Sequence, residues 1–390
     1  QSLLPLGDKD AKSGKHGAPQ TIFATYSGGV KTNRDETLYD FEREALLRRV
    51  EAFIDAYLAE LDRYRRARKR QDEIDIDAFV DYVHLKWDST LKQHLARGRE
   101  TEFDPSRARR SLYRPFCKQW LYFDRLLINS VCRQPYFFPT PAAEAENRAI
   151  CLSGVASSKP FQALMVNVLP NLDLLEKTQC FPLYVYAEDG GERRENITDW
   201  ALERFRAHYR DARIGKADIF YYIYAVLHQP AYRERFAEAL KKELPRIPLA
   251  ADFWAYAEVG RRLGDLHVGY ESAPEYPLRE VWARGKAPSY RIESAMRLES
   301  AANGEYALVV NKALRLEGIP SEALGYKLGN RAALEWLIDQ YRVKSERDPN
   351  AYGDERYVVS LVKRVVWVSL QTLQSVAGLP DPLAVVPNQA

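Results

Sequence analysis

Two stretches of the sequence combine basic side chains with turn-forming or aromatic residues. The first follows the glycines at 28 and 29 and contains Lys31, Asn33 and Arg34. The second interleaves cations with Tyr113 and Phe116, and its basic members are Arg107, Arg109, Arg110, Arg114 and Lys118. Lys and Arg bind phosphate oxygens, and N–H groups of a glycine-rich turn are further donors. The chemistry open to these residues is anion binding, and phosphate groups are the expected anion.

Each basic stretch also has a structural interpretation. The turn at 29–35 could be an interdomain hinge, and residues 107–114 could form a solvated loop. A third group ends a predicted helix and consists of Arg63, Arg65, Arg66, Arg68, Lys69 and Arg70. Cations at a helix C-terminus are favourable by about 0.3–1 kcal/mol each at low salt, so this group fits helix stabilisation as well as phosphate contact.

The motifs of several enzyme classes are missing from the sequence. It contains no GxxxxGK[ST] loop, no GxGxxG after a strand, no Asn- or Asp-Pro-Pro-aromatic tetrapeptide and no HExxH. The four cysteines form no CxxC pair. We therefore expect no catalytic residue, no metal site and no cofactor in this chain. A nuclease centre whose carboxylates converge only in space stays open as a minor alternative.

The composition limits the class of protein. Lys plus Arg number 57 against 54 Asp plus Glu, so any basic surface must be local, and we expect it to gather on one concave face. Hydrophobic residues make up 46%, which is enough for a sizeable core. No run of about 18 apolar residues predicts a membrane span. Cysteine usage is typical of reduced thiols in a cytoplasmic protein.

Periodicity predicts a mixed α+β fold. Apolar residues three and four apart predict helices at 42–70, 75–97, 217–228, 231–244, 252–266, 331–341 and 357–376. Short strands are expected at 22–26, 111–113, 119–123, 136–138, 149–155, 163–168, 181–186, 291–298 and 306–310. We divide the chain into a helical entry segment (1–110), a central strand-rich core (111–290) and a C-terminal strand pair with helices (291–390).

Five segments, in this order, resemble one known family. They are residues 29–35 (GVKTNRD), 113–116 with 120–125 (YRPF, WLYFDR), 181–186 (FPLYVY), 219–228 with 230–236 (IFYYIYAVLH, PAYRERF), and 329–336 with 339–341 and 348–350 (GNRAALEW, DQY, DPN). The family is the C-terminal target-recognition region of Type ISP-like single-chain restriction–modification enzymes. Two positions depart from it, because Cys117 and Tyr221 stand where family members often carry Asp.

The resemblance implies a division of labour. A nuclease, a helicase-like ATPase and an adenine-N6 methyltransferase would lie upstream on the same polypeptide, with S-adenosylmethionine and ATP/Mg bound only there. This chain would contribute sequence-specific recognition of double-stranded DNA. The eight basic and amide residues named above are our own candidates for the DNA contacts. The alternative is an interdomain protein–protein scaffold of the same type of enzyme, in which the helical parts hold neighbouring domains.

Overall fold

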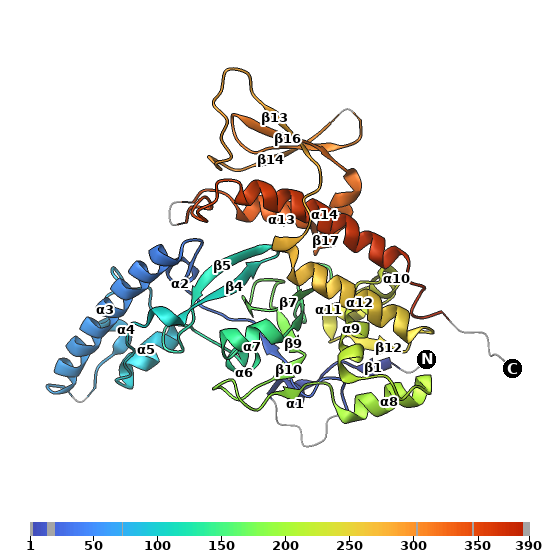
Figure 1. The fold of residues 1–390 in the computed structure, drawn as a ribbon. Helices are drawn as coiled ribbons and strands as arrows, with labels where there is room; N and C mark the ends of the chain where they lie inside the picture. Colours follow the sequence, from blue (N-terminus) through green and yellow to red (C-terminus); the bar gives the residue numbers. More distant parts are fainter. Residues whose placement is uncertain (1–2, 14–19, 72, 302, 345–346, 385–390) are drawn as a thin grey trace.

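The computed structural model describes residues 3–13, 20–71, 73–301, 303–344 and 347–384 (Figure 1). Helices and short sheets alternate along the chain, so the predicted α+β class is confirmed. Buried apolar side chains form two clusters. One links the N-terminal helices to the C-terminal part, and the other surrounds the helices of residues 199–268. None of the described helices is long and apolar enough to span a bilayer.

The N-terminal helices form an arm on the left of Figure 1. α3 (Arg43–Arg68) follows the expected apolar spacing and buries Leu46, Val50 and Tyr57 on one face. The prediction of one helix at 75–97 is wrong in its middle. α4 (Ile76–Phe79) and α5 (Ser89–Ala96) are separate helices, because the side chains of Asp75 and Asp88 each cap a new N-terminus. Val83, which the apolar spacing placed in the core, lies between them and is 87% exposed.

A β-hairpin beside the arm carries the second basic stretch. Its four-stranded sheet has the order β3 (Tyr39–Asp40), β5 (Cys117–Tyr122), β4 (Ala108–Arg114) and β8 (Leu169–Pro170). α2 (Asp35–Leu38) precedes β3, and the 3-10 turn η1 (Pro105–Arg107) precedes β4. β8 runs parallel to β4, and the other neighbours are antiparallel. The strands predicted at 111–113 and 119–123 are confirmed.

A second sheet packs against two long helices. Its order is β2 (Ser27–Gly28), β9 (Gln179–Pro182), β6 (Ala149–Leu152) and β7 (Ala163–Val166). α9 (Lys216–Val226) and α12 (Phe253–Val268) cross so closely that a Cβ on Gly260 would lie 1.8 Å from the carbonyl oxygen of Tyr221. The helix predicted at 217–228 is confirmed, as is the N-cap of α12 by Asp252.

Short elements surround this second sheet. They are α1 (Lys9–Ser13), α6 (Gln134–Phe137), α7 (Pro141–Glu146), α8 (Asp199–Tyr209), α10 (Pro230–Arg235), α11 (Ala237–Lys242), and the strand pairs β1 (Leu3–Pro5) with β12 (Arg246–Pro248) and β10 (Tyr184–Val185) with β11 (Arg194–Glu195). Two predictions are wrong here. The strand expected at 136–138 is replaced by α6, which has a proline at its N-terminus. The helix expected at 231–244 is broken at Phe236 into α10 and α11.

The C-terminal part places a sheet over two helices. The sheet has the order β13 (Arg279–Trp282), β16 (Leu314–Ile319), β15 (Tyr306–Val309) and β14 (Arg297–Ser300). Below it in Figure 1 lie α13 (Ala333–Gln340) and α14 (Tyr357–Ala377). The remaining elements are η2 (Tyr270–Ser272), η3 (Ser321–Gly325) and the pair β17 (Lys327–Leu328) with β18 (Arg331–Ala332). Both helices and the strand at 306–310 were predicted. The strand expected at 291–298 overlaps β14 only at residues 297–298, and β13 and β16 were not predicted.

The expected segment boundaries cut across sheets. The boundary at 110/111 falls inside β4, and the one at 290/291 separates β13 from its three sheet neighbours. The expected strand at 22–26 is reduced to an isolated bridge between Phe23 and Ile197, and the strand β2 follows it at Ser27–Gly28. All four cysteines are free thiols, and only Cys132 is exposed.

Candidate nucleic-acid interface

The turn at residues 30–35 is held firmly by backbone contacts. Val30 donates to the carbonyl of Pro170 at 2.8 Å, and Lys31 exchanges two backbone hydrogen bonds of 2.9 Å with Ser130. Asn33 adopts a left-handed conformation with φ 58°. This geometry leaves the side chains of Lys31 and Asn33 exposed. Lys31 therefore stands on this frame as an exposed cation, whereas the exposed Asn33 amide also donates to Asp88 Oδ2 at 3.3 Å.

Arg34 does not share this exposure. It is 1% exposed, its guanidinium donates to the carbonyl of Leu127, and Nη2 lies 2.9 Å from Asp88 Oδ1. Burial lowers the pKa of Arg34, and Asp88 opposes that effect. A phosphate has no surface of this side chain to contact. The prediction of Arg34 as a DNA contact is corrected to a structural role, in which it joins the turn to the N-terminus of α5.

The cations of β4 and β5 point in different directions, because successive side chains of a strand alternate between faces. Arg109 is directed to α7 and donates to Glu144 at 2.6 Å and to the carbonyl of Phe138 at 3.1 Å. Arg110 lies on the opposite face, over the ring of Trp120. The strand geometry therefore does not bring Arg109 and Arg110 together in one patch.

Lys118 and Arg110 belong to an internal ion cluster. The ammonium of Lys118 lies 2.7 Å from Glu271, which also accepts the hydroxyl of Tyr357 at 2.7 Å and lies 3.8 Å from Arg110. Burial acts to raise the pKa of Glu271, but Lys118 and its other partners lower it overall. These cations fix the hairpin to the C-terminal part of the fold, so they have little charge to offer to DNA.

Arg107 lies at the other end of β4 from Arg114. It forms an ion pair with Asp124 and donates to Thr101 at 2.9 Å. It lines a polar hollow of about 490 Å³ together with Arg99 and Arg125. Arg107 and Arg114 are separated by seven residues of extended chain, about 23 Å, so they could meet only different phosphates.

Tyr113 joins three segments that are distant in the sequence. Its hydroxyl donates to Asp35 Oδ2 at 3.0 Å, which connects it to the turn at 30–35. The guanidinium of Arg114 lies 4.0 Å from the centre of its ring, and that of Arg347 lies 5.1 Å from it. Arg114 also donates to Asn171 at 3.0 Å, and Arg347 to Gln119 at 3.0 Å. Cation–π contacts of this kind hold both arginines in place.

The loop after α13 adds cations that the sequence reasoning missed. Arg342 is exposed, and Lys344 is half-buried next to Arg347. Burial lowers the pKa of Lys344, and the like charges of Arg347 and Arg342 lower it further. An anion beside Lys344 would relieve that repulsion. The sequence pattern that could have indicated these contacts is the presence of three cations within residues 342–347, of which the structure describes all but 345–346.

We call Lys31, Asn33, Arg114, Arg342 and Lys344 the junction cluster. Tyr113 connects the segments that carry these residues, because its hydroxyl donates to Asp35 in the turn and its ring contacts Arg347 in the loop after α13. The hollow beside the turn, about 350 Å³, is not itself basic, since Asp35, Glu36 and Asp173 line it along with Lys31 and Lys86. A phosphate would therefore lie against the outer ends of the cluster and not inside that hollow.

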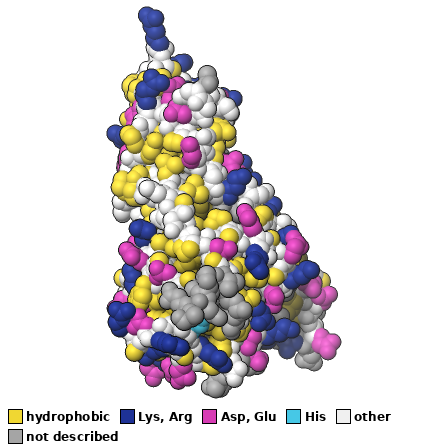
Figure 2. Space-filling view, turned by 90° about the vertical axis from the view of Figure 1, so that its right-hand side faces the viewer, with side chains coloured by type: hydrophobic (Ala, Val, Ile, Leu, Met, Phe, Trp, Pro, Cys, Tyr) yellow, Lys and Arg dark blue, Asp and Glu magenta, His cyan; other side chains and the backbone are white. Residues whose placement is uncertain are grey.

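Other parts of the surface are mixed in charge. On the face that Figure 2 shows, Lys and Arg side chains alternate with Asp and Glu, and hydrophobic side chains occupy much of the upper part. The expected concentration of cations on one concave face is not seen on this side. Among the described residues, no group of three or more His, Cys, Asp or Glu is placed to hold a metal ion.

Comparisons with known proteins agree with the sequence motifs. The chain matches the model of the Type ISP C-terminal specificity domain over residues 21–361. It resembles the structure of a DrdV–DNA complex with 35% identity and a TM-score of 0.83, covering 97% of this chain and 38% of that one. A nuclease-deletion mutant of the Type ISP restriction–modification enzyme LlaGI, solved with a DNA substrate mimic, gives 30% identity, a TM-score of 0.80, and coverage of 97% and 29%.

A further solved structure is the ATP-dependent Type ISP enzyme LlaBIII bound to DNA, at 26% identity, a TM-score of 0.81, and coverage of 97% and 24%. The chain thus spans less than two fifths of the length of each of these proteins. No match was found among curated protein sequences.

Proposed function

The chain belongs to the Type ISP C-terminal specificity domain family, and from this premise we propose that it recognises a specific sequence in double-stranded DNA. It would act as the target-recognition part of a larger restriction–modification protein with adenine-N6 methyltransferase activity. The observation that carries the proposal is the match of nearly the whole chain to two proteins at least 30% identical that were solved with DNA or a DNA mimic.

The junction cluster supplies the phosphate contacts in this proposal. Phosphate contacts fix the register of a protein on the duplex, and base-edge contacts in the grooves read the sequence. Lys31, Asn33, Arg342 and Lys344 are the contacts we assign to the backbone. Arg114 contacts the Tyr113 ring and Asn171, and the part of its guanidinium that is not used in these contacts would bind a phosphate. Arg107, at the far end of β4, is a contact to a separate phosphate.

The partners and cofactors follow from the family. Methyltransferase and helicase–nuclease domains of the same polypeptide would position this chain, and S-adenosylmethionine and ATP/Mg would bind in those domains. We place the protein in the cytoplasm, where host DNA is methylated.

Selection from a random library of DNA duplexes tests the proposal. The chain is immobilised, duplexes are bound and eluted over several rounds, and the eluted pool is sequenced. We expect one motif to be enriched, since each mismatched base pair costs about 1–3 kcal/mol in specific complexes. Retention of duplexes without an enriched motif would contradict sequence recognition by this chain.

A scaffold is the second candidate function, and the arm favours it. Tyr82 and Val83, between α4 and α5, are 55% and 87% exposed, and paired apolar side chains on a projecting arm are suited to a protein contact. Charge reversal at Arg109, Arg110 or Arg114 does not separate the two functions, because all three side chains carry internal contacts. The library selection does separate them, since a pure scaffold enriches no DNA motif.

A further inference from the structure

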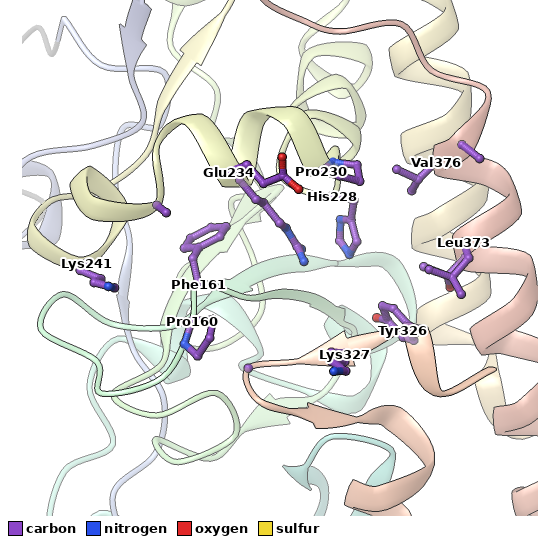
Figure 3. Close-up of a pocket in the computed structure, with 16 residues that line it drawn as sticks. Pro160, Phe161, His228, Pro230, Glu234, Lys241, Tyr326, Lys327, Leu373 and Val376 are labelled. Carbon is purple, nitrogen blue, oxygen red and sulfur yellow. The ribbon is translucent and has the colours of Figure 1, made fainter. Parts of the chain in front are cut away.

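One pocket is lined by none of the residues that we assign to DNA contacts. It lies between α10, α11, the end of α14 and the turn at residues 325–329, and its volume is about 740 Å³ (Figure 3). Phe161, His228 and Tyr326 approach the cavity from three different elements, and Leu373 and Val376 face it from α14. The size is typical of a small-molecule site.

Arg233 places a positive charge beside this pocket, on a side chain that is half-buried. Its Nε donates to the carbonyl of Leu227 at 2.6 Å, but Nη2 is enclosed and has no hydrogen-bond partner among the described residues. Its electrostatic neighbours are the hydroxyls of Tyr326 and Tyr224, and burial lowers the pKa of Arg233. Arg34 is also enclosed, but it has a carboxylate 2.9 Å away. The guanidinium also lies 5.9 Å from the centre of the Phe161 ring, but no carboxylate pairs with it among the described residues. A largely enclosed cation without a counter-charge is costly, so Arg233 calls for an anion.

Two further polar groups around the pocket are unpartnered. His228 is 5% exposed, and its Nδ1 lies 2.8 Å from the carbonyl of Tyr224, so Nδ1 carries the proton and Nε2 is left as an acceptor without a donor. The hydroxyl of Tyr326, which is 4% exposed, also lacks a partner within the described ranges. Burial, and after it the charge of Arg233, lowers the pKa of His228, so the imidazole is neutral and Arg233 is the cation at this part of the pocket.

The lining defines the chemistry of the ligand. Around Arg233 the walls are mostly apolar and consist of Pro160, Phe161, Pro230, Ala237, Leu373, Val376 and Ala377. The charged lining residues are Arg233, Lys241 and Lys327 against Glu234, which favours a negative ligand. One planar guanidinium matches one carboxylate, while the multiply charged backbone of DNA would find too few donors here.

We propose that this pocket binds a carboxylate carried on an apolar body, with the carboxylate against Arg233 and the body against Phe161 and Leu373. The site is separate from the junction cluster, so this inference does not rest on the proposed function.

Calorimetric titration of the chain with decanoate tests the site, with decanol as the uncharged probe of the same length. We expect decanoate to bind, and Arg233→Met to weaken it at least about tenfold, because a hydrogen bond to a charged group is lost. Arg233→Met should leave decanol binding unchanged and should lower the melting temperature only slightly, because the lost hydrogen bond to Leu227 is offset by removal of a charge that has no carboxylate partner. Ala377→Trp, at an exposed position of the lining, should block both probes.

Three results would overturn the proposal. The first is wild-type protein that does not bind decanoate. The second is Arg233→Met protein that binds it as tightly as wild type, or, if that variant does not fold, Ala377→Trp protein that still binds it. The third is competition between decanoate and a DNA duplex, which would assign the pocket to the nucleic-acid surface.

Discussion

Removing the negative charge of Asp88 should destabilise the fold, and it reaches the proposed DNA surface only through the 3.3 Å hydrogen bond that Asn33 donates to Asp88. Asp88→Asn keeps the N-cap of α5, because Asn caps helices as well as Asp does. It leaves Arg34, which is 1% exposed, with the carbonyl of Leu127 as its remaining strong partner. Removing one partner of a buried ion pair costs about 3–5 kcal/mol, and we expect a loss of that size.

The reverse change should cost less. Arg34→Met removes the cation, but Asp88 keeps hydrogen bonds from the Leu91 amide at 2.8 Å and from Asn129 at 3.1 Å. We therefore expect a loss of about 1–3 kcal/mol, with unchanged DNA affinity per folded molecule. Urea unfolding followed by tryptophan fluorescence measures both variants, and the double variant measures their coupling.

The stability difference should also depend on pH in a defined direction. Burial acts to raise the pKa of Asp88, but the Leu91 amide and Arg34 lower it overall. A carboxyl whose folded pKa is lowered adds stability above its unfolded pKa of about 3.9, and that stability is lost as the pH falls through the folded pKa. The gap between wild type and Asp88→Asn should be constant from pH 7 to pH 5 and shrink below pH 4. Equal stability of the two proteins at pH 7, or loss of DNA binding in folded Arg34→Met protein, would refute this account of Arg34.

Two further changes probe the frame. Gly260→Ala should destabilise by about 3 kcal/mol or more, because the new methyl group overlaps the α9 backbone, whereas Gly378→Ala, with nothing within 4 Å, should be nearly neutral; thermal unfolding compares them. Glu271→Gln should cost about 3 kcal/mol of unfolding free energy, since it leaves the cations of Lys118 and Arg110 without their carboxylate. This loss should diminish on acidification, because the pKa of Glu271 is lowered in the fold. Urea unfolding that shows no change would contradict the internal role of Lys118.

Local patterns predicted the long elements well. α3 and α14 repeat apolar residues over many turns, and the β-branched composition of α14 did not obscure its helical period. The errors lie in short elements. The apolar spacing of residues 79–95 is helical, but Asp88 offers a second N-cap, and the local hydrogen bonds of that cap divide the segment.

The site could be predicted only in part, because burial depends on partners far away in the sequence. Lys31 and Asn33 are exposed as expected. Lys118 meets a carboxylate 153 positions later, and Arg347 reaches a glutamine 228 positions earlier. Such contacts leave no periodic signal, so the basic stretch at 107–118 appeared uniform although its members separate onto two faces and two ends of a strand.

The salt dependence of duplex binding tests the central claim most directly. With about four to six phosphate contacts, a plot of log affinity against log salt should have a slope near −4 to −5. Lys31→Ala and Lys344→Ala should each reduce the slope by about one unit, while Lys286→Ala, an exposed cation in the loop after β13, should not change it. Binding that is absent or insensitive to salt, or slopes that Lys31→Ala and Lys344→Ala leave unchanged, would contradict DNA recognition through the junction cluster.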